Sequence, residues 1–174
     1  MPALKRIVVI GPESTGKSSV SAAIAQNLHT KWVPEHARTY LEQINRPYEY
    51  DDLLHIARGQ LADEAAAATT ANRFLICDTD LHVIRVWSEH RFGICALPIL
   101  QALAQQQADL YLLTNIDFPW QPDPQREHPE PHWRQYFFRI YQDIVVRSNR
   151  PFALLSGTPE ERLHTALAAI RILQ

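Results

Sequence analysis

Residues 11–18 read Gly-Pro-Glu-Ser-Thr-Gly-Lys-Ser, which is a complete G-x-x-x-x-G-K-[ST] phosphate-binding loop. A short, apolar and β-branched run over residues 6–10 precedes the loop, and a helical pattern follows it. The alternative is a glycine-rich turn that closes a βα unit and binds nothing. Because the strand–loop–helix context makes the motif specific, we favour nucleoside triphosphate binding.

The residues of this loop suit a polyphosphate for physical reasons. Gly11 and Gly16 allow the backbone to wrap the phosphates with its N–H groups pointing inward, and the following helix N-terminus adds positive potential. Lys17 can bridge the β- and γ-phosphates, and Ser18 can ligate Mg²⁺. The expected cofactors are therefore ATP and Mg²⁺.

Composition limits the remaining classes of protein. The 174 residues, 46% of them hydrophobic, suit one domain with a real core over 1–174. A net charge of −2 does not favour nucleic acid as a partner, and no apolar run approaches the length of a membrane span. The two cysteines, Cys77 and Cys95, predict neither a disulfide framework nor a zinc site, so we expect a cytoplasmic protein.

Apolar runs alternate with helical patterns along the chain. Strands are predicted at residues 6–10, 31–33, 74–77, 110–113 and 152–155. Helices are predicted at residues 17–29, 36–45, 51–71, 81–91, 97–107, 132–148 and 159–172, with Asp51 and Asp52 capping the third. Such apolar strands imply an α/β fold with a five-stranded parallel sheet that is covered by helices on both faces.

Polar residues follow several of the predicted strands. In a parallel sheet the carboxyl ends of the strands lie at one edge, and ligands bind there. We therefore expect Gly11, Glu35, Asp78 and Asn115 to be neighbours.

Asp78 and Asp80 come directly after the strand at 74–77. A carboxylate beside a phosphate-binding loop typically holds Mg²⁺ directly or through water, so Asp78 is the candidate metal ligand beside Ser18. The alternative is that Asp78 caps the next helix. For Asp80, capping that helix and contacting a substrate hydroxyl are equally favoured.

Glu35 ends the second strand, where a carboxylate could accept a proton from a substrate hydroxyl, as a kinase base must. A solvated loop glutamate explains the same position equally well. Arg38 could pair with Glu35 or reach the substrate.

Residues 117–134 contain five prolines, which exclude a regular helix or a central strand. Since loops of this length are usually functional or disordered, and since Trp120 and Trp133 argue against disorder, we expect a lid over the active site. Arg126 and Arg134 flank this segment and could stabilise the charge of a transferring phosphoryl group. This role is favoured over a solvated surface position for Arg126, whereas the two are nearly even for Arg134.

Three aromatic residues, Tyr40, Trp87 and Trp120, could stack on a flat or cationic ring. Packing in the core is at least as favoured for Trp87, because it lies on a predicted helix. Stacking gains support for Trp120, which lies among prolines.

Several blocks of the sequence together resemble the ribosylnicotinamide kinase domain of the bifunctional NadR proteins, from Lys5 to about Arg162. Beyond the phosphate-binding loop, these blocks are Glu35–Tyr40, Ile56–Gln60, Asp78–Asp80 and Asp117–Trp120, followed by Asp123 and Arg126.

The resemblance implies a P-loop kinase fold and transfer of the γ-phosphoryl group of ATP to the 5′-hydroxyl of nicotinamide riboside, which gives nicotinamide mononucleotide, a precursor of NAD. It implies that ATP contacts Gly11, Glu13, Ser14, Thr15, Gly16, Lys17, Ser18 and Ser19. It places Glu35, Arg38, Asp78, Asp80, Trp120, Asp123 and Arg126 on the side of the substrate and the lid.

Two interpretations of function remain. The first is a small-molecule kinase in which Lys17, Glu35, Asp80 and Arg126 act in catalysis, with nicotinamide riboside or another nucleoside as the acceptor. The second is an ATP-dependent switch without a small-molecule acceptor, in which the proline-rich segment would dock a partner. The sequence itself predicts no oligomeric state and no partner protein.

Overall fold

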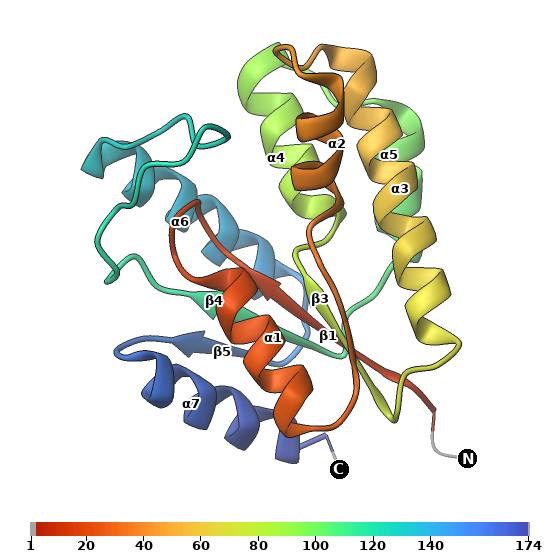
Figure 1. Ribbon diagram of the computed structural model, residues 1–174, viewed down its shortest axis with the longest axis vertical. Helices are drawn as coiled ribbons and strands as arrows, with labels where there is room; N and C mark the ends of the chain where they lie inside the picture. The colour runs from red at the N-terminus through yellow and green to blue at the C-terminus, as the bar shows by residue number, and fades with distance from the viewer. Residues whose placement is uncertain (1–2, 174) are drawn as a thin grey trace.

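The computed structural model describes residues 3–173, in which five parallel strands form one sheet between two layers of helices (Figure 1). The order across the sheet is β2-β3-β1-β4-β5. The strands are β1 (Lys5–Ile10), β2 (Lys31–Val33), β3 (Phe74–Asp78), β4 (Leu110–Thr114) and β5 (Phe152–Leu155). The predicted fold class, a five-stranded parallel α/β sheet of the P-loop type, is confirmed.

Helices α1 (Lys17–Asn27) and α7 (Pro159–Arg171) cover one face of the sheet. Their apolar side chains pack on alternate residues of the central strands, among them Ile7 and Val9 of β1, which are fully buried. This layer places the N-terminus of α1 directly after β1, where the phosphate-binding loop joins the two elements (Figure 1).

The opposite face is covered by α3 (Tyr50–Ala68), α4 (Leu81–Phe92) and α6 (Pro131–Arg147). Two shorter helices, α2 (His36–Ile44) and α5 (Leu97–Gln105), pack with α3 and α4 around a separate apolar cluster. Figure 1 shows these four helices grouped to one side of α6. Residues of α2, α4 and α6 line one pocket together with the loop that follows β1.

Two local predictions were wrong. Helix α3 begins at Tyr50, and its cap is Glu49, whose side chain bonds the backbone of Asp52 while Asp52 bonds back to the backbone of Glu49. Asp52 is therefore the partner in a capping box rather than the cap itself.

The second correction concerns the end of the proline-rich segment. Pro131 stands in the first turn of α6, where proline fits because its missing N–H needs no helical partner. Trp133 and Arg134 are consequently helical, and the irregular stretch, called the proline-rich segment below, covers residues 115–130. Within residues 3–173, no helix is both long and apolar enough to cross a membrane.

Candidate active site

The phosphate-binding loop is held close against the end of β4. A Cβ atom at Gly11, whose φ is +152°, would lie 2.3 Å from Oγ1 of Thr114, so only glycine fits there. The hydroxyls of Thr15 and Thr114 lie 2.7 Å apart in a buried hydrogen bond. Gly16, with a φ of +77°, then starts α1 from a left-handed conformation.

Arg162 of α7 fixes the same loop from the other side. Its side chain is 1% exposed and donates hydrogen bonds to the backbone carbonyls of Thr15 and Asn115 and to the carboxylate of Asp117. Its guanidinium also stacks 3.8 Å from the ring centre of Phe118. A buried arginine is tolerated only when its donors are paired, and here they tie together segments that are far apart in sequence. Nothing in the local sequence pattern distinguished Arg162.

The carboxyl end of β3 lies beside the start of α1. Ser18 Oγ donates a hydrogen bond of 2.5 Å to Oδ2 of Asp78, and Oδ1 of Asp78 is buried without a hydrogen-bond partner among the described residues. A hydroxyl and a carboxylate with a free oxygen are the ligands that Mg²⁺ prefers. The pair therefore fits the expected metal site.

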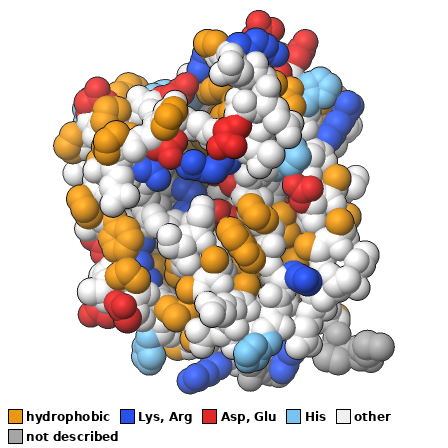
Figure 2. Space-filling view, in the orientation of Figure 1, with side chains coloured by type: hydrophobic (Ala, Val, Ile, Leu, Met, Phe, Trp, Pro, Cys, Tyr) orange, Lys and Arg blue, Asp and Glu red, His pale blue; other side chains and the backbone are white. Residues whose placement is uncertain are grey.

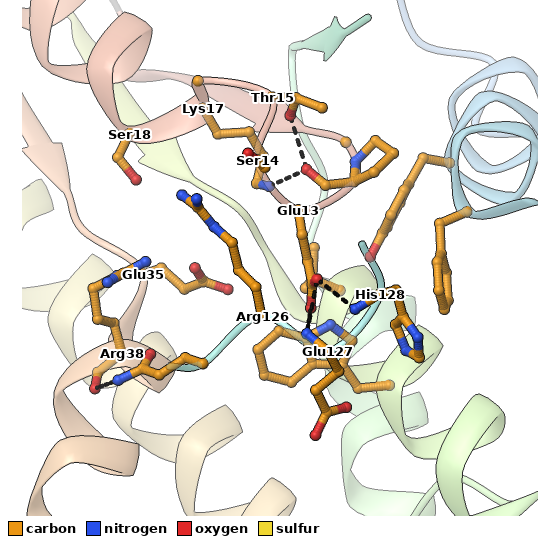
Figure 3. Close-up of a pocket in the computed structure, with 18 of the residues that line it drawn as sticks. Glu13, Ser14, Thr15, Lys17, Ser18, Glu35, Arg38, Arg126, Glu127 and His128 are labelled. Carbon is orange, nitrogen blue, oxygen red and sulfur yellow. Dashed lines mark hydrogen bonds between the residues drawn. The ribbon is translucent and has the colours of Figure 1, made fainter. Parts of the chain in front are cut away.

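Glu35 lies at the mouth of the loop, between the phosphate-binding residues and α2 (Figure 3). The pKa of its carboxyl group is raised to about 7, chiefly by burial and in part by the negative charge of Asp78, against the opposing charges of Lys17 and Arg38. Burial also raises the pKa of Asp78. A carboxyl group with a pKa near 7 can both accept and release a proton at neutral pH.

The structure places Asp80 outside the lining of this cleft. It is the N-cap of α4, accepts a hydrogen bond from the backbone N–H of His82 and lies 3.0 Å from Nδ1 of the same histidine. Burial opposes its ionisation, but the neighbouring His82 lowers the pKa of Asp80 overall. Tyr111 Oη completes this buried set of contacts at 3.4 Å. The geometry is that of the capping role.

The proline-rich segment lies across the cleft and is bonded to the phosphate-binding loop. The carboxylate of Glu13 accepts hydrogen bonds from the backbone N–H groups of Glu127, at 3.1 Å, and His128, at 3.4 Å (Figure 3). Ser14 Oγ accepts a hydrogen bond from the backbone N–H of Gln121. Glu13 and Ser14, which stand at variable positions of the loop motif, therefore bind the backbone of the proline-rich segment.

A second set of contacts joins the segment to α2. Arg38 forms an ion pair with Asp123 at 3.1 Å, and Gln125 donates to the carbonyl oxygen of Arg38. Figure 3 shows the side chain of Arg126 extending between Glu13 and Glu35 toward Lys17 and Ser18. Its guanidinium donates a hydrogen bond of 2.5 Å to the carbonyl oxygen of Gln121 in the same segment.

Part of the lining of this cleft is largely aromatic, and this part is called the aromatic chamber below. Its ring-bearing residues are Tyr48, Trp87, His90, His128, Phe137 and Tyr141, and Leu41 and Val83 add aliphatic surface. In Figure 2, Lys and Arg side chains gather in a hollow of the visible face, with acidic side chains beside them.

Among these residues only Trp87 was a sequence candidate. A helical spacing places Val83, Trp87 and His90 on one side of α4, and Phe137 and Tyr141 on one side of α6. This spacing is a signal of burial, and it does not reveal that the two helix faces enclose a cavity together with the proline-rich segment.

Like Asp78 and Asp80, five other candidates lie outside the residues that line the cleft. Tyr40 donates a hydrogen bond of 2.8 Å to Asp52, Asp123 is bonded to Arg38, and the ring of Trp120 lies 6.0 Å from the guanidinium of Arg126. Arg134 is bonded to the carbonyl oxygen of Ser14 at 3.3 Å. Asn115 bonds Ser156 beside Arg162.

Comparison with known proteins gives a family match over most of the chain. A family model described as an AAA domain matches residues 6–162. A search of curated proteins finds no match.

Solved structures agree in fold. A NadR protein in complex with NR is similar with a TM-score of 0.78 and 21% sequence identity, and the match covers 97% of this chain and 51% of that protein. A NadR protein in complex with NAD and AMP-PNP is similar with a TM-score of 0.74 and 22% identity, and the match covers 97% of this chain and 49% of that protein. The chain spans about half the length of these proteins. Thymidylate kinase from Ehrlichia chaffeensis has 0.66 at 16% identity, over 99% of this chain and 100% of its own.

Proposed function

The chain belongs to the AAA domain family of the matching model, and from this premise we propose that it is an ATP-dependent kinase whose acceptor is nicotinamide riboside. The observation that carries the proposal is the continuity of the cleft. The phosphate-binding loop, Glu35 and the aromatic chamber line one cavity, so a nucleotide phosphate and a ring-bearing acceptor could be held side by side. The fold is that of P-loop nucleoside and nucleotide kinases.

The loop end of the cleft would bind the triphosphate. Lys17 would neutralise the phosphates, and Ser18 and Asp78 would hold Mg²⁺, which when bound offsets the charge that develops during phosphoryl transfer. The side chain of Lys17 donates to the carbonyl oxygen of Pro12 at 2.7 Å, which places its amino group over the loop. Arg126, held in the proline-rich segment, would face the γ-phosphate.

Glu35 would act as the base. It lines the same cleft as the phosphate-binding loop and the aromatic chamber, so a hydroxyl group of an acceptor in this cleft could approach both Glu35 and the γ-phosphate. A pKa near 7 keeps enough of the carboxylate ionised at neutral pH to take the proton of that hydroxyl. We assign this role to Glu35 rather than to Asp80, whose carboxylate is engaged by His82 and Tyr111.

Nicotinamide riboside is favoured as the acceptor by the chemistry of the chamber. Its pyridinium ring is a flat cation, which an aromatic face such as that of Trp87 attracts. The carboxylates of Glu13 and Glu127 add negative charge at the rim. The similarity of the fold to a NadR protein in complex with NR is consistent with this choice.

ADP release with ATP and Mg²⁺ tests the proposal against a panel of nicotinamide riboside, the common ribo- and deoxyribonucleosides, and a blank. Strong stimulation by nicotinamide riboside alone is the expected result. Stimulation by another nucleoside would keep the kinase and replace the acceptor. Equal rates across the panel, blank included, would favour the ATP-dependent switch.

A further inference from the structure

The candidate base stands at a junction between α2 and α3. Glu35 is the N-cap of α2, with φ −63° and ψ 110°, and its own side chain makes no capping hydrogen bond, which leaves the carboxylate to the cleft. The next backbone N–H, that of His36, donates a hydrogen bond of 2.9 Å to Oε1 of Gln60 on α3. The side chain of Gln60 therefore satisfies a backbone N–H at the start of α2 that the side chain of Glu35 does not cap.

The side chain of His36 is held by the same part of α3. A Cβ atom at Gly59 would lie 2.0 Å from Nε2 of His36, so the imidazole packs directly over the backbone of α3. Nδ1 of His36 lies 2.6 Å from a carboxylate oxygen of Asp63 on the next turn. A glycine in a helix interior is unfavourable by itself, but at Gly59 the absence of a side chain leaves room for the imidazole of His36.

Gln60 is itself held by a buried polar network. Its Nε2 donates to Glu64 at 3.2 Å, and Glu64 also accepts hydrogen bonds from Arg6 on β1 and from Gln106 beyond α5. Gln60 is 2% exposed and Glu64 is 6% exposed. Because Gln60 and Glu64 are buried and Glu64 is anchored to β1 through Arg6, Gln60 has little freedom to move, and neither has the His36 N–H that it holds.

We propose that Gly59 and Gln60 are positioning residues for the reaction, which fix through His36 where the carboxylate of Glu35 stands in the cleft. The inference rests on the proposed function, in which Glu35 is the base. It assigns a role to Gly59 and Gln60 of α3, which do not line the cleft among the residues that the structure describes.

The test compares two identical substitutions in the same network. Gln60→Met removes the bond to His36 and one bond to Glu64, whereas Gln106→Met removes only a bond to Glu64. We expect Q60M to lower kcat about tenfold or more, with KM for ATP within about twofold of the wild type. Q106M should keep both constants within about twofold. Equal losses in the two variants, or none in Q60M, would overturn the proposal.

A spectroscopic readout separates this inference from the kinase proposal. The ¹³C resonance of the Glu35 carboxyl group, recorded without nucleotide, should shift in Q60M and not in Q106M. If the wild type phosphorylates nothing and this pattern still appears, the kinase proposal fails and the positioning role stands. An unshifted resonance in Q60M would overturn the positioning role whatever the activity.

Gly59→Ala keeps the inference testable if Q60M does not fold, because it changes none of the side chains in the network of Gln60. The added methyl group meets only His36 among the three nearest contacts. We expect the same loss of kcat and the same shift of the Glu35 resonance. A variant with wild-type kcat and an unshifted resonance would overturn the proposal.

Discussion

Ser18, at the end of the phosphate-binding loop, and Asp78, at the end of β3, are joined by a hydrogen bond of 2.5 Å. The bond links the start of α1 to the end of β3, while the second oxygen of Asp78 is buried without a hydrogen-bond partner in residues 3–173. A divalent cation between the pair and the phosphates would use both groups.

Asp78→Asn tests this arrangement. We expect the Mg²⁺ concentration for half-maximal activity to rise about tenfold or more, because an amide is a weaker ligand than a carboxylate. A titration of kcat with Mg²⁺ measures it, with Asp143→Asn, an exposed position on α6, as the matched control. An unchanged Mg²⁺ requirement would remove Asp78 from the metal site.

The pKa of Glu35 predicts how activity depends on pH. As a base it works only when ionised, so kcat/KM should fall about tenfold per unit as the pH drops below about 7. Glu35→Gln should remove this acid limb and lower kcat by a factor on the order of 100 or more. A profile for E35Q that keeps the acid limb would assign the base to another residue.

The same group makes the fold less stable as pH rises. Burial raises the pKa of Glu35 from 4.5 to about 7, so the folded chain binds this proton more tightly than the unfolded chain. The stabilisation is present below about pH 4.5 and is lost as pH rises to about 7.

Urea unfolding of the wild type and of E35Q at pH 5 and pH 8 measures this loss. From pH 5 to pH 8, the free energy of unfolding of E35Q should rise by on the order of 2 kcal/mol relative to that of the wild type. Glu42→Gln, an exposed change on α2, serves as the control. Parallel curves for E35Q and the wild type would show that this proton does not contribute.

Arg162→Lys probes the anchor of the phosphate-binding loop. A lysine cannot reproduce the separate hydrogen bonds to Thr15, Asn115 and Asp117 or the stacking on Phe118. We expect a loss of about 2–4 kcal/mol in the free energy of unfolding and a higher KM for ATP. Arg171→Lys, an exposed change in the same helix, should alter neither quantity, and equal effects in both variants would refute the anchor.

Local patterns were sufficient to predict the phosphate-binding loop and the strands. Residues 11–18 form a contiguous motif, and the strands are apolar runs whose burial follows from their composition. Both can therefore be recognised from short stretches of sequence. The same holds for Ser18 and Asp78, because parallel topology brings strand ends to one edge.

The aromatic chamber and Arg162 could not be predicted in this way. His90 and His128 meet at a ring-centre distance of 5.2 Å only because α4 packs beside α6 and the proline-rich segment folds back over both. Arg162 is a buried cation whose partners are three backbone carbonyls and one carboxylate, and the sequence pattern of α7 does not predict these contacts. For Asp80, helix capping and substrate contact were equally favoured by the sequence, and the structure shows Asp80 as the cap of α4.

The most direct test of the central claim follows the γ-phosphorus of ATP by ³¹P NMR and mass spectrometry in the presence of nicotinamide riboside and Mg²⁺, with Lys17→Ala as the control. If one cleft holds both molecules, the phosphorus appears as a 5′-monoester of the nucleoside, one for each ADP, and K17A loses product formation by a factor on the order of 100. Release of the phosphorus as inorganic phosphate alone, with the nucleoside recovered unchanged, would contradict the account.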